Sequence, residues 1–206
     1  MSDMQELARQ LAPEFEVTRE LGSGAMGTVY LAREVALRRL VAIKVPLAEL
    51  ADDEQVLARF QREAHAAARI HHRGACTLHR IGTLEDGTPY LVMEYVEGKT
   101  LDDVLAAGGT FDVDTAMSIL EQVSGALAAA HAVGVVHRDI RPGNVIWDAA
   151  AGRAVLTDFG IAGILETGSE AVTRITRMGQ TLGQVGFSSP EQLLGETVTA
   201  ATDVYS

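Results

Sequence analysis

Apolar and polar residues alternate loosely at 15–21 and again at 41–45, a spacing that is typical of strands with one buried face. Runs rich in β-branched and aromatic residues predict five strands, at 15–21, 28–32, 41–45, 78–83 and 89–95. Residues 52–70 differ, because they open with acidic residues and then place apolar side chains three and four positions apart. This part of the chain therefore predicts an antiparallel sheet with one helix.

From residue 96 onward the pattern is mainly helical. It predicts two helices and then two short strands, at 101–107, 112–133, 145–147 and 154–157. Residues 158–189 are rich in glycine, threonine and serine, and long segments of this kind inside a compact domain are usually functional. The chain thus divides into an N-terminal helix or tail, a sheet-rich part and a helical part, at 1–14, 15–95 and 96–206.

Composition narrows the function classes. Hydrophobic residues make up 47% of the chain, which is enough for a core, and the net charge of −11 argues against a nucleic-acid-binding surface, which needs a basic face. The single cysteine, Cys76, cannot form a disulfide within the chain and is expected to be a small buried residue in a reducing, cytoplasmic protein. No run approaches the ~20 apolar residues that span a bilayer, so we expect no membrane segment here, although a longer form could be anchored.

Three glycines, Gly22, Gly24 and Gly27, follow the first predicted strand and precede the second. Glycine-rich turns let backbone amides approach phosphates closely, but they also simply make tight turns. A dinucleotide-binding fold would place a helix after the last glycine, whereas here a strand follows. The pattern favours a hairpin that covers phosphates, with a plain tight turn as the alternative.

Lys44 is one of two lysines in the chain and lies within a predicted strand. Alternation along 41–45 places it on the same face as Ala42, opposite the other apolar residues. A lysine in such a strand either extends to solvent or meets an anion, and Glu63 on the following helix is a candidate partner. The alternative is a hydrated lysine on an edge strand.

The loop at 137–144 contains two cations, an acid and an amide, namely Arg138, Arg141, Asp139 and Asn144. The acid can take or orient a hydroxyl proton, the cations can neutralise phosphate, and the amide oxygen can bind a metal. Asp158 follows fourteen residues after Asn144, and the two can supply the hard oxygen ligands that Mg²⁺ prefers. A polar loop with proline and glycine explains the composition of 137–144 but not the position of Asp158.

Five motifs in this order resemble the signature set of the eukaryotic-like protein kinases. They are the glycine-rich run, Val-Ala-Ile-Lys, His-Arg-Asp with its asparagine, Asp-Phe-Gly and Ser-Pro-Glu, at 22–29, 41–44, 137–144, 158–160 and 189–191. The runs at 62–64, 93–98 and 189–193 look most like bacterial serine/threonine kinases. The resemblance covers about residues 15–206. It implies an α+β, protein-kinase-like bilobal fold, with a five-stranded antiparallel N-lobe that has one helix and an incomplete, mainly helical C-lobe.

The resemblance also implies roles for the motif residues. ATP would contact Gly22, Ser23, Gly24, Gly27, Val29, Ala42, Lys44, Glu94 and Val96. Lys44 would pair with Glu63, Asp139 would be the catalytic base, and Arg141 would make an altered phosphate contact in place of the family's lysine. Asn144 and Asp158 would hold Mg²⁺, with Mn²⁺ as the other candidate ion. Arg138 implies control by a phosphorylated activation loop. The candidate phosphate acceptors are Thr173, Thr176 and Thr181, and the alternative is that these threonines belong to a solvated polar loop.

The implied activity is transfer of the γ-phosphate of ATP to serine or threonine hydroxyls of proteins, including the chain itself or a second kinase copy. Ile140-Arg141-Pro142 resembles the Leu-Lys-Pro of serine/threonine kinases, whereas tyrosine kinases carry Ala-Ala-Arg. The alternative is a catalytically silent or truncated kinase-like module that binds nucleotide or a partner. Arg141 and Gln184, which stands where the family has a threonine, favour this alternative, while the intact motif acids and Lys44 favour the enzyme.

The chain ends where the central helix of the second lobe should begin, at Asp203. In the family this helix supports the catalytic loop, and later helices supply an arginine for the acid that corresponds to Glu191. We therefore expect exposed apolar surface on 112–136 and around Leu193 and Leu194, and a Glu191 without its partner. Residues 1–206 alone are expected to be unstable or to aggregate.

Overall fold

The structure is a computed structural model of the chain, and it describes residues 3–24, 27–47, 54–159 and 186–206. The described residues pack as two compact units, Met1–Ala64 with Thr77–Tyr95, and His65–Cys76 with Val96–Ser206. Residues 65–76 therefore belong to the second unit, although the residues on both sides of them in sequence belong to the first. No helix in these described ranges is long and apolar enough to cross a membrane.

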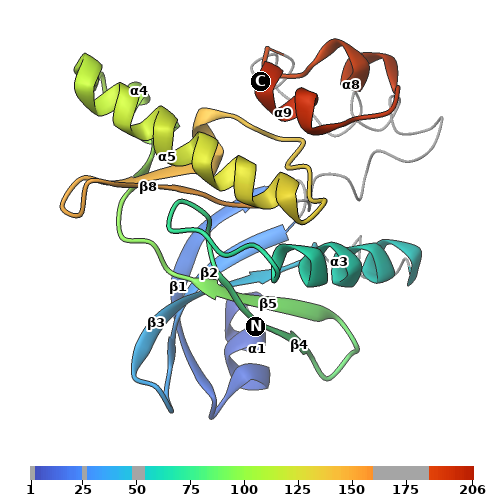
Figure 1. The fold of residues 1–206 in the computed structure, drawn as a ribbon. Helices are drawn as coiled ribbons and strands as arrows, with labels where there is room; N and C mark the ends of the chain where they lie inside the picture. The colour runs from blue at the N-terminus through green and yellow to red at the C-terminus, as the bar shows by residue number, and fades with distance from the viewer. Residues whose placement is uncertain (1–2, 25–26, 48–53, 160–185) are drawn as a thin grey trace. The chain divides into compact units, whose positions relative to one another are not determined.

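The first unit is built on an antiparallel sheet (Figure 1). Its strands in the described ranges are, in spatial order, β1 (Phe15–Gly24), β2 (Gly27–Glu34), β3 (Arg39–Val45), β5 (Pro89–Glu94) and β4 (Leu78–Thr83). All five predicted strands are present. β1 and β2 extend beyond the predicted runs, because their backbone pairing continues to Gly24 and Gly27.

Helix α1 (Asp3–Leu11) packs against one face of this sheet. Leu7 and Leu11 of α1 are buried with Val41 and Ile43 of β3, so the N-terminal segment is a helix that contributes to the core. Two polar contacts fix it to the turn between β4 and β5: Arg9 forms an ion pair with Glu85 at 3.0 Å, and the Glu85 amide donates to the Gln10 side chain at 3.0 Å.

Helix α3 (Glu54–Ala67) carries the predicted apolar side, because Phe60 and Ala64 are buried. Ile70 is also buried, but it lies in a turn after the helix, where its amide donates to the Ala67 carbonyl at 3.0 Å. The helix therefore ends earlier than the predicted residue 70. The side chain of Glu63 lies outside the described part of the chain.

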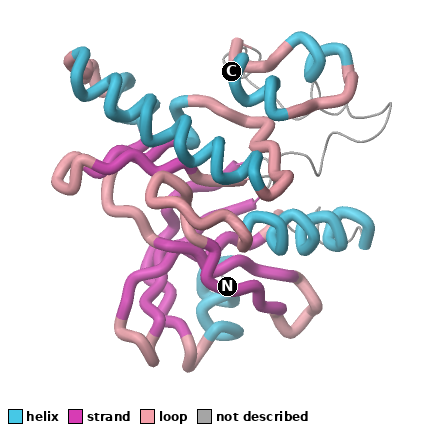
Figure 2. Tube along the Cα trace, viewed as in Figure 1, coloured by secondary structure: helices cyan, strands magenta, loops and turns pink. Residues whose placement is uncertain are grey.

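The second unit is mainly helical (Figure 2). Its helices in the described ranges are α4 (Leu101–Ala106), α5 (Val113–Ala132), α8 (Pro190–Leu194) and α9 (Ala200–Tyr205), with a 3₁₀ turn η1 (Pro142–Asn144). A second antiparallel sheet there has the order β6 (Lys99–Thr100), β7 (Val145–Asp148) and β8 (Arg153–Leu156). The predictions missed β6 and α8, which are too short to show a hydrophobic period. The helix expected to begin at Asp203 is present as α9, which begins earlier, at Ala200.

Helix α5 forms the core of the second unit with the β7–β8 hairpin. Its side chains Ile119, Val123 and Leu127 are buried together with Val145 and Leu156. Asp112 caps the helix, since its carboxylate accepts a hydrogen bond from the Thr115 amide at 2.7 Å.

Residues 65–76 are joined to β8 through the backbone. The Leu156 amide donates to the Gly74 carbonyl at 2.8 Å, and the Cys76 amide donates to the Leu156 carbonyl at 2.9 Å. Cys76 itself is partly exposed rather than fully buried, because the loop lies along the edge of this hairpin.

Apolar side chains on α5 and α8 are exposed where exposure was expected, for example Met117, Leu120 and Leu194. Glu191, in contrast, has a partner: the Thr202 hydroxyl donates to it at 2.6 Å, which lowers the pKa of Glu191. Glu191 therefore has a hydrogen-bond donor in α9, although this donor is not the arginine that the resemblance implies.

Candidate active site

The glycine-rich run forms the β1–β2 hairpin that the sequence predicts. Gly22 lies opposite Val29, and Gly24 opposite Gly27, while the turn at 25–26 is outside the described residues. The hydroxyls of Ser23 and Thr28 are 3.0 Å apart across the pair. The glycines thus lie between two strands, which excludes the strand–glycine–helix arrangement of dinucleotide-binding folds.

The glycines of this hairpin differ in what surrounds them. Gly27 has a φ of +149°, and a Cβ built there would lie 2.2 Å from the Val45 carbonyl oxygen, so the fold itself requires glycine. No described atom lies within 4 Å of a Cβ built on Gly22 or Gly24. The structure leaves space at these two positions, which is what a backbone that approaches a phosphate needs.

We predict that Gly27→Ala and Gly24→Ala separate stability from nucleotide binding. Gly27→Ala should lower the free energy of unfolding by about 1–3 kcal/mol through backbone strain. Gly24→Ala should leave it unchanged and weaken ATP binding by about tenfold, or ~1.4 kcal/mol, if the hairpin covers phosphates. Thermal unfolding with and without Mg·ATP measures both the stability and the ATP binding of each variant. Equal losses of stability and of ATP binding in the two variants would contradict the prediction.

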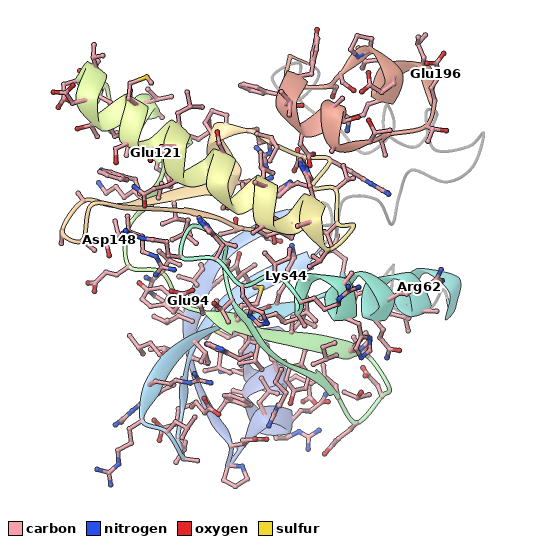
Figure 3. The ribbon with its side chains drawn as sticks, in the orientation of Figure 1. Lys44, Arg62, Glu94, Glu121, Asp148 and Glu196 are labelled. Atoms are coloured by element: carbon pink, nitrogen blue, oxygen red, sulfur yellow. The ribbon has the colours of Figure 1, made fainter. Side chains whose placement is uncertain are left out.

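Lys44 lies in a central strand, with β2 on one side and β5 on the other. Its side chain is only 4% exposed, which excludes the alternative of a hydrated lysine on an edge strand. Figure 3 labels Lys44 on β3 and Glu94 at the end of β5. The predicted pairing of Lys44 with Glu63 stays a prediction, because the side chain of Glu63 is outside the described part of the chain.

The register of the sheet brings several predicted nucleotide-binding residues onto one face. Val29 lies opposite Lys44 in the β2–β3 pair, and Ala42 is two residues from Lys44. Directly opposed residues share a face, as do residues two apart along a strand, so the three side chains lie on the face opposite the α1 core. Glu94 is anchored by its amide, which donates to the Thr77 carbonyl at 2.9 Å, and Val96 is buried at the start of the next segment.

His137 organises the start of the 137–144 loop. It is fully buried, packs edge-on against Phe159 with ring centroids 4.9 Å apart, and its Nε2 lies 2.7 Å from the Thr157 carbonyl. Its Nδ1 accepts from the Asp139 amide at 3.2 Å, so the proton is on Nε2. Burial lowers the pKa of His137, which keeps the ring neutral and able to make both contacts.

Asp203 of α9 supports the same loop and is 3% exposed. Its carboxylate accepts from the His137 amide at 2.8 Å, from the Arg138 amide at 2.7 Å and from His131 Nε2 at 2.7 Å. Arg138 has a φ of +71°, a region that non-glycine residues rarely occupy. The strained backbone before Asp139 is therefore held in place by a buried carboxylate.

Asp139 is oriented from within the loop. Asn144 Nδ2 donates to Asp139 Oδ2 and to the Asp139 carbonyl, both at 2.7 Å, and Arg141 Nε donates to Oδ2 at 3.4 Å. The side chain is 38% exposed, so the carboxylate is accessible to an incoming hydroxyl. The structure thus brings together three of the predicted catalytic residues.

Arg141 lies between two carboxylates, Asp139 and Asp102 of α4, the second at 3.7 Å. Gly143 makes room for this arrangement, because a Cβ there would lie 2.6 Å from Asp102 and 2.8 Å from Arg141. Sequence reasoning missed Asp102, which stands in a different element and in no motif.

The residues present fit a divalent cation. The Asn144 carbonyl accepts hydrogen bonds from both the amide and the hydroxyl of Thr157, at 2.9 and 3.1 Å. Asp158 is the next residue after Thr157, so these bonds keep it near Asn144. Because Asn144 Nδ2 is used toward Asp139, its amide oxygen faces away and remains an acceptor. The described ranges contain no group of three or more histidine, cysteine or acidic residues that could hold a metal ion.

The predicted regulatory residues are only partly within the described chain. Arg138 Nε is buried and has no hydrogen-bond partner among the described residues, which suits a side chain that pairs with an added phosphate. Thr173, Thr176, Thr181 and Gln184 lie outside the described ranges.

Comparison with known proteins identifies the family of the chain. The family described as protein kinase domain matches residues 15–206. The chain is 38% identical over 200 residues to serine/threonine-protein kinase PrkC of Bacillus subtilis (strain 168), with 97% of this chain and 30% of PrkC covered. It is 37% identical over 200 residues to PknA of Mycobacterium tuberculosis (strain ATCC 25618 / H37Rv), with 95% and 45% covered. The chain therefore spans less than half the length of these curated relatives.

Solved structures show the same fold. The crystal structure of the M. tuberculosis PknI kinase domain matches with a TM-score of 0.70 and 30% sequence identity, covering 93% of this chain and 68% of that one. This confirms the predicted α+β, protein-kinase-like fold with a five-stranded sheet. The chain belongs to the protein kinase family, and the curated relatives named above are serine/threonine kinases of bacteria.

Proposed function

We propose that this chain transfers the γ-phosphate of ATP to serine or threonine hydroxyls of proteins, including its own. The observation that carries the proposal is the Asp139 carboxylate, which is partly exposed and oriented by Asn144 and Arg141 on a loop anchored by buried groups. Together with the named kinases it resembles, this arrangement favours the enzyme over a silent nucleotide-binding module.

In the proposed reaction Asp139 orients the acceptor hydroxyl and takes its proton. A new bond forms between the hydroxyl oxygen and the γ-phosphorus, the bond from that phosphorus to the β,γ-bridging oxygen breaks, and ADP leaves. Lys44, Gly22 and Gly24 hold the phosphates, and Arg141 adds positive charge beside Asp139.

Asn144 and Asp158 are the proposed ligands of a divalent ion, and Mg²⁺ is the preferred candidate because it takes few protein ligands beside phosphate oxygens. Such an ion supplies charge neutralisation on the phosphates when bound. The chain's own residues contribute the two oxygen ligands and the hydrogen bonds that fix Asn144.

The acceptor class can be tested directly. We expect the chain, given Mg·ATP and a mixture of serine, threonine and tyrosine peptides, to place phosphate on serine and threonine only. The expectation follows from the resemblance of Ile140-Arg141-Pro142 to the Leu-Lys-Pro of serine/threonine kinases. Chelation with EDTA should stop transfer, and excess Mg²⁺ should restore it. Phosphotyrosine as the main product, or transfer that resists EDTA, would contradict the proposal.

A further inference from the structure

Gln192 on α8 uses both ends of its side-chain amide. The side-chain Oε1 accepts a hydrogen bond from the Ser189 backbone amide at 3.0 Å. In return the backbone amide of Gln192 donates to the Ser189 hydroxyl at 3.4 Å, and the two hydrogen bonds form a capping box. Its Nε2 donates to the Arg138 carbonyl at 2.6 Å, across 54 positions of sequence. One side chain thus caps α8 and holds the loop that carries Asp139.

The Arg138 carbonyl belongs to the peptide that leads into Asp139. Asp203 holds the His137 and Arg138 amides, and Gln192 holds the carbonyl that follows them. The Arg138 φ of +71° is unfavourable, so this peptide keeps its orientation only when its neighbours fix it. Rotation of the peptide would change the direction of the Asp139 side chain.

Capping alone does not require glutamine. A glutamate at the third helical position completes a capping box equally well, and its negative charge is favourable in the first turn of a helix. What glutamate lacks is a donor for the Arg138 carbonyl. An amide is the side-chain group that accepts from Ser189 and donates to Arg138 at the same time.

We infer that Gln192 is a positioning residue for phosphate transfer, because its hydrogen bond to the Arg138 carbonyl sets the orientation of Asp139. The inference rests on the proposed function, since it depends on the role of Asp139. It also gives α8 a direct mechanical connection to the catalytic loop.

The test is Gln192→Glu in the full chain, with Ser189→Ala as the matched control. Gln192→Glu keeps the cap but loses the donor and places a carboxylate against a carbonyl oxygen. We expect kcat to fall by about tenfold, the factor equivalent to ~1.4 kcal/mol, with KM for ATP within about twofold in a chain that remains folded. Ser189→Ala loses the capping hydroxyl but keeps the contact to Arg138, so it should lower the melting temperature and keep kcat.

Gln192→Met is a second variant, for the case in which the new carboxylate disturbs folding. It keeps the length of the side chain, has no donor, and should show the same loss of kcat. Unchanged kcat in a folded Gln192→Glu or Gln192→Met variant would overturn the inference, as would a loss of kcat in Ser189→Ala as large as theirs.

Hydrogen exchange at the Arg138 and Asp139 amides is a readout that needs no turnover. We expect faster exchange at these amides in Gln192→Glu and unchanged exchange in Ser189→Ala. If the unsubstituted chain transfers no phosphate, the proposed function fails, and the exchange result alone decides whether Gln192 holds the loop. Equal exchange in Gln192→Glu and the unsubstituted chain overturns the positioning role.

Discussion

Asp139→Asn should slow phosphate transfer by about a thousandfold or more while the chain stays folded and binds ATP. The substitution keeps the size of the side chain and one oxygen, which can still accept the hydrogen bond from Asn144 that Asp139 Oδ2 accepts. It removes the negative charge and the basic oxygen that would receive the hydroxyl proton. The effect should therefore fall on kcat, because the nucleotide-binding residues Lys44, Gly22 and Gly24 are unchanged.

Two measurements together check this result. Initial rates of transfer to a serine peptide give kcat, and titration of the chain with Mg·ATP gives the nucleotide affinity, which should stay within about threefold. An equal loss of transfer and of ATP affinity would show that Asp139 acts in binding and not as the base.

Asn144→Asp is a useful companion variant, because it places a second acid beside Asp139 and should disturb both kcat and the affinity for Mg·ATP.

Asp203→Ala should have the largest effect on the structure. It removes the shared acceptor of two backbone amides and of His131, and the amides of His137 and Arg138 are then left without a partner in a buried site. Removing a buried carboxylate that accepts several hydrogen bonds lowers the free energy of unfolding by about 3–5 kcal/mol. Because these amides belong to the loop that carries Asp139, transfer should be lost as well.

The matched control for this prediction is His131→Ala. It removes one of the donors to Asp203 at a partly exposed position and leaves both loop amides in place, so it should cost only about 1 kcal/mol. Urea unfolding measures both variants, and hydrogen exchange at His137 and Arg138 reports on the loop itself. An Asp203→Ala chain as stable as His131→Ala, with a protected loop, would refute the anchoring role.

Much of this fold follows from local patterns. Each strand of the first unit has a run of β-branched or aromatic residues. Alternation correctly separated Lys44 and Ala42 from Val41 and Ile43, which are the residues buried with α1. The 137–144 loop could be predicted because its acid, cation and amide lie within eight residues and contact one another directly. Short-range chemistry of this kind is visible in the sequence.

Long-range partners are not visible in the same way. Asp203 reaches the loop amides across 65 and 66 positions, and Gln192 reaches the Arg138 carbonyl across 54. Hydrophobic periodicity carries no signal for such contacts, and only the family resemblance indicated that the helix at Asp203 supports the loop. The Ser-x-x-Gln spacing at 189–192 was an available signal, because it matches a capping box and so predicts the start of α8.

Glu191 has a hydrogen-bond partner that the resemblance does not imply. The family pattern implied an arginine partner from later helices and hence an unpartnered acid, whereas the Thr202 hydroxyl meets Glu191 within the second unit. The Lys44–Glu63 pair and the activation-loop threonines stay predictions, since Glu63's side chain and residues 160–185 lie outside the described part of the chain.

The most direct test of the central claim is the intact mass of the purified chain after incubation with Mg·ATP, beside Asp139→Asn treated in the same way. We predict mass increments of whole phosphates that map to serine or threonine residues and that are absent from the Asp139→Asn sample. A folded chain that binds Mg·ATP but gains no phosphate on itself or on a serine peptide would contradict the claim, as would equal phosphorylation of the Asp139→Asn variant.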